Sequence, residues 1–282
     1  MKLVSYRYEG RIGVGKTDGE MITALGSRLS MPVPDMIALI ANWDSLAEEV
    51  RAATGNDHAL GDVELLAPVQ RPGKIFGLGM NYADHVAEAA MPMPEDQIWF
   101  TKAVTSVNGP CAPVELPKAS ALLDYEAELV FIIGKRCRHV SADQAAGVIF
   151  GYCAGNDFSV RDWQLKTSQY VLGKSFDTHA PFGPWIVTPD EIDPAALPIR
   201  STVNGEVRQS SNTRHFIFDP AAQIAHLSQA MTLEPGDVIF TGTPGGVGAA
   251  MKPPSFLKAG DVVRVEIDGI GAIENRVVNE AG

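Results

Sequence analysis

The sequence predicts an α+β fold in which a small N-terminal α/β domain precedes a larger domain rich in β-strands. Two observations support this prediction. Helical patterns are confined to a few segments, and from residue 74 onward short apolar runs alternate with turns that contain glycine or proline. Because helices do not alternate regularly with these strands, the sheets are expected to be antiparallel or mixed.

The N-terminal domain is predicted to begin with short strands over residues 3–25, joined by glycine-containing turns. Apolar residues at helical spacing then predict helices over 36–40 and 45–53. Two prolines and a glycine between residues 68 and 73 indicate a connection. We therefore expect two domains, residues 1–70 and 71–282.

In the larger domain, a β-branched and aromatic run closed by glycine predicts a buried strand over 124–134. A second apolar run, over 148–154, predicts a neighbouring strand, and residues 237–240 predict another. The one clear helical pattern in this domain covers residues 220–231.

Two carboxylates lie within the first of these strands. Side chains alternate between the faces of a strand, so Glu126 and Glu128 point the same way. Like charges and burial both raise the pKa of a carboxyl group, so the pair must protonate, reach water or bind a cation. The alternative is a wet strand end at which both acids form salt bridges with arginine or lysine.

A third acid, Asp157, follows the strand predicted over 148–154. Three carboxylates on adjoining strands would form an all-oxygen site, with no histidine or cysteine beside them. This donor set favours Mg²⁺, Mn²⁺ or Ca²⁺ over Zn²⁺.

His85 and Glu88 are three residues apart in a segment that is predicted to form a helical turn. They would share one face, so the carboxylate can orient the imidazole as a water-activating base. A solvated pair on a surface helix is the alternative. The Pro/Met segment 91–94 that follows is a candidate lid, and we expect this lid and the N-terminal domain to set substrate selectivity.

Arg161 and Gln164 follow Asp157 within a short helix-like segment, and Lys174 is suited to hold an oxyanion or a substrate carboxylate. Salt bridges within an acidic surface are the alternative for Arg161 and Lys174. Two nucleotide motifs fail. Tyr82 replaces the third glycine of a dinucleotide fingerprint, and Ser168 replaces the first glycine of a phosphate loop.

The net charge of −11 over 282 residues, with a pI of about 5.0, argues against binding to nucleic acid. No uncharged stretch is long enough to span a bilayer, and no signal-peptide pattern opens the chain. We therefore expect a cytoplasmic protein that does not bind membranes and whose partner is a small anionic substrate. The three cysteines predict no chemistry.

These motifs resemble those of the fumarylacetoacetate hydrolase superfamily. The matching pieces, in order, are residues 79–85, 124–129, 156–164, 173–178, 203–206, 231–237, 241–244 and 256–261. Two stretches depart from the family pattern, residues 101–104 and 212–218, and we expect both to affect substrate shape.

The resemblance implies a mixed β-sandwich roll, usually in a homodimer, with Mg²⁺ or Mn²⁺ (or Ca²⁺ in crystals) on Glu126, Glu128 and Asp157. It implies a catalytic dyad of His85 and Glu88 on a lid, with Lys174 as a further catalytic residue. The residues that it assigns to substrate binding are Tyr82, Arg161, Gln164 and Thr243.

The implied activity is hydrolysis of a C–C bond in a 1,3-dicarbonyl acid, such as an acylpyruvate or fumarylpyruvate, through an enolate stabilised by the metal. Decarboxylation of an oxaloacetate-type acid, or isomerisation or hydration of a 2-oxo-enoic acid, is the alternative on the same site. A binding protein without catalysis is a further alternative, which the full set of acids, Lys174, His85 and Glu88 disfavours.

Overall fold

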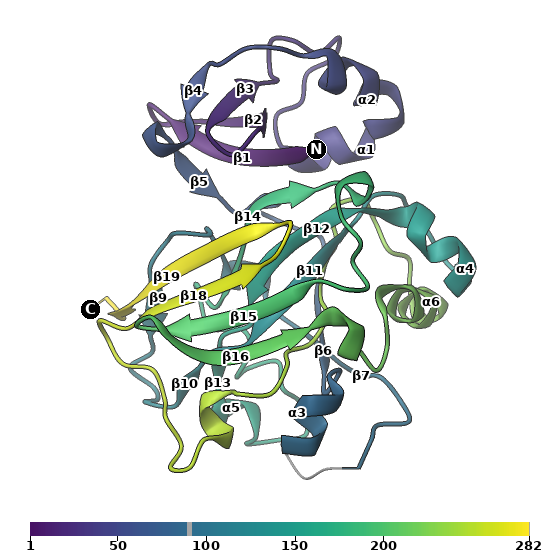
Figure 1. The fold of residues 1–282 in the computed structure, drawn as a ribbon. Helices are drawn as coiled ribbons and strands as arrows, with labels where there is room; N and C mark the ends of the chain where they lie inside the picture. Colours follow the sequence, from purple (N-terminus) through teal and green to yellow (C-terminus); the bar gives the residue numbers. More distant parts are fainter. Residues whose placement is uncertain (89–91, 282) are drawn as a thin grey trace.

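A computed structural model describes residues 1–88 and 92–281. It confirms the α+β class, with large sheets and few helices (Figure 1). The α-helices are α1 (Met36–Ala41), α2 (Trp43–Ala52), α3 (Ala83–Glu88), α4 (Ala142–Ala145), α5 (Arg161–Gln164) and α6 (Pro220–Ala230). None of the described helices is long and apolar enough to cross a membrane.

Most strands belong to one twelve-stranded sheet with the order β4-β3-β2-β1-β14-β12-β11-β17-β6-β7, to which β5 adds beside β1 and β8 beside β14. Its strands are β1 (Lys2–Tyr8), β2 (Arg11–Thr17), β3 (Met21–Ala24), β4 (His58–Ala59), β5 (Glu64–Leu66), β6 (Ile75–Gly79), β7 (Ile98–Thr101), β8 (Val107–Asn108), β11 (Ala127–Ile133), β12 (Ile149–Asn156), β14 (Ala180–Val187) and β17 (Val238–Phe240).

A five-stranded sheet lies against this sheet in the larger, C-terminal part of the chain (Figure 1). Its order is β16-β15-β18-β19-β9, with β9 (Val114–Leu116), β15 (Pro198–Val203), β16 (Glu206–Asn212), β18 (Val262–Ile267) and β19 (Gly271–Asn279). Leu129 and Phe131 of β11 share one apolar core with Ile199 of β15 and Val265 of β18. Burial of these side chains between the sheets stabilises the sandwich.

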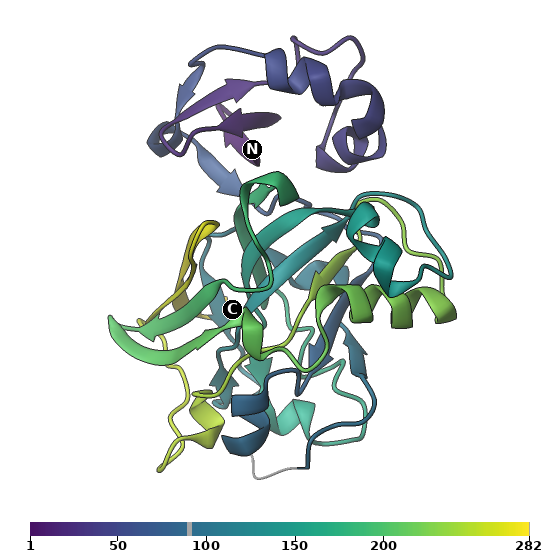
Figure 2. The same cartoon turned by 45° about the vertical axis from the view of Figure 1, so that its right-hand side comes forward.

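The N-terminal elements form one end of the molecule, and helices α3 and α5 lie at the other end (Figures 1 and 2). The larger sheet joins the two parts, because Lys2 of β1 pairs with Val187 of β14. Trp43 of α2 also packs edge-on against Phe150 of β12, with ring centroids 5.0 Å apart. The division at residue 70 falls between β5 and β6 and remains a prediction.

The strand predicted over 124–134 is interrupted. Leu123–Asp124 forms β10, which pairs with β13 (Ser159–Val160), and the long strand β11 begins only at Ala127. Side chains replace ladder partners at the break: the N–H of Glu126 donates to Asn156 Oδ1 at 2.9 Å, and the N–H of Ala127 donates to Gln209 Oε1 at 3.0 Å. Glu126 therefore lies between β10 and β11, outside the regular strand pairing.

Candidate active site

The three acids that the sequence singles out come together where β11 and β12 meet. Ala127 pairs with Asn156, and the N–H of Asp157 donates to the carbonyl of Glu126 at 2.9 Å. One carboxylate oxygen from each of Glu126, Glu128 and Asp157 lies within 4.8 Å of the others, and all three side chains are buried. The register of two antiparallel strands therefore builds the cluster.

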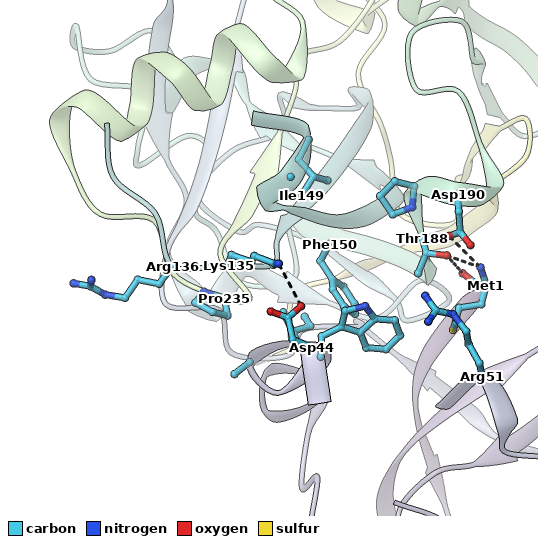
Figure 3. Close-up of a pocket in the computed structure, with 16 residues that line it drawn as sticks. Met1, Asp44, Arg51, Lys135, Arg136, Ile149, Phe150, Thr188, Asp190 and Pro235 are labelled. Atoms are coloured by element: carbon cyan, nitrogen blue, oxygen red, sulfur yellow. Dashed lines mark hydrogen bonds and ion pairs between the residues drawn. The ribbon is translucent and has the colours of Figure 1, made fainter. Parts of the chain in front are cut away.

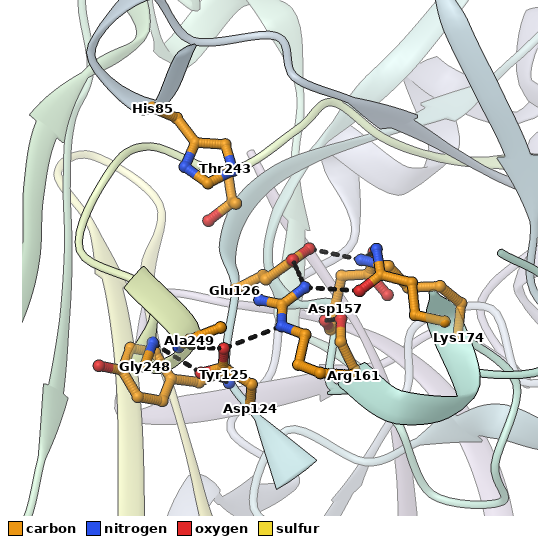
Figure 4. Close-up of polar contacts among 12 residues, drawn as sticks. His85, Asp124, Tyr125, Glu126, Asp157, Arg161, Lys174, Thr243, Gly248 and Ala249 are labelled. Carbon is orange, nitrogen blue, oxygen red and sulfur yellow. Dashed lines mark hydrogen bonds and ion pairs between the residues drawn. The ribbon is translucent and has the colours of Figure 1, made fainter. Parts of the chain in front are cut away.

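Buried cations contact two of these acids (Figure 4). Lys174 Nζ lies 2.5 Å from Glu126 Oε2 and 2.6 Å from Asp157 Oδ2, and so bridges them. Lys102 Nζ donates to Asp157 Oδ1 at 2.5 Å. Arg161 donates from Nη1 to Glu126 Oε1 at 2.6 Å and from Nε to Asp124 Oδ2 at 2.9 Å.

Glu126 and Glu128 have opposite electrostatic surroundings. Burial alone would raise the pKa of Glu126, but Lys174 and Arg161 outweigh it and lower that pKa to about 2. Burial, Asp157 and Glu126 together raise the pKa of Glu128 well above its usual range. The hydrogen bond that Glu128 accepts comes from the N–H of Gly242, at 2.7 Å. Glu128 is thus a buried acid that no described lysine or arginine pairs.

The sequence left open whether salt bridges or a metal make these acids tolerable, and the structure shows salt bridges to Glu126 and Asp157. Four buried carboxylates, those of Asp124, Glu126, Glu128 and Asp157, face two buried lysines and the partly buried Arg161. With Glu128 ionised, the four carboxylates carry one negative charge more than the three cations. A divalent cation would offset this charge, and a donor set made only of oxygen suits Mg²⁺ or Mn²⁺. Each carboxylate oxygen has two lone pairs, so a salt bridge does not exhaust it.

A cavity of about 380 Å³ opens onto the cluster. Its charged and polar lining residues are His85, Glu88, Glu126, Glu128, Arg161, Gln164, Tyr170, Lys174 and Thr243. Most of the remaining wall is apolar, and includes Leu78, Met80, Ile98, Phe100, Leu165 and Val247. None of the described lining residues falls within residues 1–70, and the expectation that the N-terminal domain sets selectivity stays a prediction.

His85 and Glu88 lie on α3 and line this cavity. His85 Nδ1 is 3.5 Å from Glu88 Oε2, an ion-pair contact that lacks hydrogen-bond geometry. Glu88 accepts a hydrogen bond of 2.9 Å from the N–H of Gly246. The backbone of the glycine-rich loop over residues 241–248 therefore fixes the carboxylate that faces the imidazole. Of the candidate lid, Met91 lies outside the described residues.

Arg161, Gln164 and Thr243 line the cavity as well. Gln164 Oε1 accepts a hydrogen bond of 2.8 Å from Arg161 Nη1, and Thr243 donates to the carbonyl of Ala127 at 2.9 Å. Arg161 Nη2 is buried without a hydrogen-bond partner among the described residues. It is therefore a donor that remains for a bound anion.

Tyr82 lies apart from the cavity wall. Its side chain is fully buried and its ring packs against Phe216, with centroids 4.8 Å apart. Burial, Glu128 and Asp84 raise the pKa of its hydroxyl. A role of Tyr82 in substrate binding stays a prediction.

Comparison with known proteins identifies the family. The pattern described as fumarylacetoacetate (FAA) hydrolase C-terminal matches residues 74–278. The chain belongs to the fumarylacetoacetate hydrolase family. Its match begins at β6, so it covers the part of the chain that supplies all the described residues of the cavity wall.

Family relatives carry several activities. Oxaloacetate tautomerase fahd2, mitochondrial, of Xenopus laevis is 44% identical over 99% of this chain and 90% of its own. The structure of fumarylacetoacetate hydrolase from Exiguobacterium antarcticum is 38% identical over 99% of this chain and all of that one, with a TM-score of 0.89. Maleylpyruvate hydrolase from Sphingobium sp., solved with manganese(II) and pyruvate, is 33% identical over the full length of both chains, with a TM-score of 0.85.

Lys102 and Asp124 belong to the site, although sequence reasoning assigned neither a role. Residues 101–104 were expected to affect substrate shape, but Lys102 is buried against Asp157. Asp124 is buried beneath Arg161 and accepts hydrogen bonds from the N–H groups of Gly248 and Ala249 at 2.8 and 2.9 Å. The sequence does offer one indication for Lys102, because this lysine directly follows an apolar strand.

A larger cavity, of about 590 Å³, lies where the N-terminal helices meet the main sheet (Figure 3). It does not touch the acid cluster, and its lysine and arginine side chains form ion pairs at the protein surface. Lys135 pairs with Asp44 at 3.3 Å, Arg51 pairs with Glu48, and Arg136 pairs with Glu234 at 3.1 Å. Size alone therefore does not mark the active site, and the smaller cavity contains the chemistry.

Proposed function

We propose that this chain catalyses the metal-assisted hydrolysis of a C–C bond in an acylpyruvate-type 2-oxo acid. The supporting observation is that His85 and Glu88 face the same cavity as Glu126 and Glu128. A general base and a cluster of acids on one cavity can act on one small substrate.

Glu126, Glu128 and Asp157 would hold Mg²⁺ or Mn²⁺. When bound, the cation supplies Lewis-acid polarisation of the 2-oxo acid. The relative from Sphingobium, solved with manganese(II) and pyruvate, supports this assignment.

His85, oriented by Glu88, takes a proton from water as the water oxygen attacks the carbonyl carbon of the acyl group. A C–O bond forms, and the carbonyl π electrons move to oxygen. Collapse of this oxyanion breaks the C–C bond and leaves its electron pair on the pyruvate enolate. His85 returns its proton to the enolate carbon, which gives pyruvate and regenerates the base, and the acyl group leaves as a carboxylic acid.

Lys174, Gln164 and Arg161 donate hydrogen bonds to the oxygens that carry charge along this path. Lys174 lies in the acid cluster with its Nζ 4.7 Å from the centre of the Phe100 ring, at the boundary between the charged and apolar parts of the cavity. Arg161 Nη2 is a buried donor with no hydrogen-bond partner among the described residues. Donors that are held in place before the reaction stabilise a developing oxyanion most effectively.

Tautomerisation of an oxaloacetate-type acid is the second candidate, and the 44% identity to the Xenopus laevis tautomerase favours it. This reaction moves a proton between carbon and oxygen and needs no water. The same acids and donors would serve it. Small anionic 2-oxo acids are the proposed partners in either case, and the homodimer stays a prediction.

Activity of the Mn²⁺-loaded protein and of His85→Asn separates the two candidates. We expect the wild type to release pyruvate from acetylpyruvate, and His85→Asn to lower that rate by about 10²- to 10⁴-fold. His139→Asn is the control, because His139 does not line the cavity and its Nδ1 lies 3.2 Å from Gln229 Oε1. Oxaloacetate tautomerisation without pyruvate release from any acylpyruvate would overturn the hydrolase proposal.

A further inference from the structure

The basic side chains on the described wall of the active-site cavity lie beside the acid cluster. The positively charged groups of this wall are Arg161 and Lys174, together with the imidazole of His85 when protonated. Both Arg161 and Lys174 contact acids of the cluster. The part of a substrate that lies against the cluster therefore meets cations, and the part that lies beyond them meets none among the described residues.

An apolar wall leads away from these basic side chains, which mark the charged end of the cavity. Phe100 of β7 begins it, with its ring beside Lys174 Nζ and its centroid 6.2 Å from that of Tyr170, which also lines the cavity and carries a neutral hydroxyl. Ile98 lies two residues earlier on the same face of the edge strand, about 7 Å farther along. Leu165 follows α5 at the mouth, where it is 69% exposed. Exposure rises along this order, from 8% at Phe100 to 69% at Leu165.

Nearby basic side chains do not add charge to this wall. Lys166 follows Leu165, but its Nζ lies 5.0 Å from the centre of the Trp163 ring and does not line the cavity. Arg208 pairs with Glu206 at 3.0 Å. A negatively charged group on the wall would lose water and find no described counter-ion, which is unfavourable.

We propose that the enzyme selects 2-oxo acids whose arm beyond the reacting carbons is uncharged and apolar, and that it discriminates against a second carboxylate at the end of that arm. Phe100, Ile98 and Leu165 are the specificity-determining residues. This inference rests on the proposed 2-oxo-acid chemistry. A diacid as short as oxaloacetate keeps both carboxylates near the charged end, so the discrimination applies to longer arms.

Binding of unreactive 2-oxo acids to the Mn²⁺-loaded protein tests the inference without requiring turnover. We expect calorimetric affinity to rise about two- to fourfold per methylene from 2-oxobutanoate to 2-oxoheptanoate. We expect 2-oxoadipate, which carries a terminal carboxylate, to bind at least about tenfold more weakly than 2-oxoheptanoate.

Leu165→Arg places a cation at the mouth and should improve 2-oxoadipate binding about tenfold while weakening 2-oxoheptanoate binding. Leu172→Arg is the matched control. It adds the same charge to a leucine of the same segment that is 59% exposed and does not line the cavity. It should change neither affinity by more than about twofold.

The inference would be overturned if affinity did not change from 2-oxobutanoate to 2-oxoheptanoate, or if 2-oxoadipate bound as tightly as 2-oxoheptanoate. Neither result would affect the proposed reaction. An equal gain in 2-oxoadipate affinity for both arginine variants would overturn the role of Leu165. If the ranking holds but no acylpyruvate is cleaved, the apolar-arm selectivity stands and the proposed hydrolysis fails. Absence of binding by every 2-oxo acid would overturn both.

Discussion

The charged end and the apolar wall of the active-site cavity are held together by different forces. At the charged end, buried groups of opposite sign pair with one another, as Lys174 does with Glu126 and Asp157. An unpaired charge destabilises the protein when it is buried. Removing one member of an ion pair therefore leaves the other as an unpaired buried charge. On the wall, from Phe100 to Leu165, a substitution mainly changes the apolar area that a ligand covers. Large, coupled effects are therefore expected at one end and small, graded effects at the other.

Asp157→Asn should have the largest effect. It removes a charge that faces Lys102, Lys174 and the other two acids, so we expect loss of Mn²⁺ binding and a fall in turnover of at least about 10³-fold. Calorimetry and a pyruvate-release assay measure the two effects. Asp162→Asn is the control, because Asp162 is an exposed acid of α5 outside the cavity wall. Full turnover by Asp157→Asn would show that the charged end does not depend on this buried carboxylate.

Lys102→Met should destabilise the protein by about 3 kcal/mol, because it removes one of the two cations that contact the fully buried Asp157. Urea unfolding measures the change. Lys135→Met removes a lysine whose partner, Asp44, is exposed, and should change stability by no more than about 0.5 kcal/mol. Equal effects of the two variants would show that burial does not strengthen the charged end.

Glu128→Gln should stabilise the metal-free protein at neutral pH by about 1 to 2 kcal/mol. The raised pKa of Glu128 in the folded state means that folding disfavours its charged form, so the penalty grows as the pH rises above the unfolded value of about 4.3. Glutamine can keep the hydrogen bond from Gly242 without that penalty.

Urea unfolding of both proteins between pH 4 and 8, with a chelator present, should show the advantage of Glu128→Gln vanish near the acid end of this range. With Mn²⁺ in place of the chelator, the order should reverse, because a bound ion stabilises only the wild type. A variant that is less stable than the wild type at pH 7 without metal would contradict the account of Glu128.

Ile98→Val should have the smallest effect. It removes one methylene from the wall, so we expect the Kd of 2-oxoheptanoate to rise by up to about fourfold, or about 0.8 kcal/mol. Pyruvate, which has no arm to reach Ile98, should bind unchanged. A comparable loss of pyruvate affinity would show that the two ends of the cavity are not separable.

The sequence was sufficient for the parts of the site that strand periodicity governs. Alternation along a strand placed Glu126 and Glu128 together, and an apolar run placed Asp157 after a neighbouring strand. The interruption between β10 and β11 was not predicted, because it depends on Asn156 and Gln209, which are distant in sequence and supply side-chain acceptors.

The pairing of charges was also beyond the sequence. Lys102 and Lys174 are 72 positions apart, and only the fold brings both to Asp157. From the sequence, salt bridges and a bound metal were treated as alternatives that exclude each other. The structure shows that the cations pair two of the acids and leave Glu128 without a described cationic partner. Such a balance follows from tertiary packing and has no local signature.

The central claim is that the buried acids hold one divalent ion, and calorimetric titration of Mn²⁺ into the metal-free protein tests it most directly. Performed in two buffers of different ionisation enthalpy, the titration should give one ion per chain with release of protons, since Glu128 must lose its proton to bind. Both the binding and the proton release should disappear in Glu128→Gln. An absence of binding to the wild type, or equally tight binding to this variant, would contradict the claim.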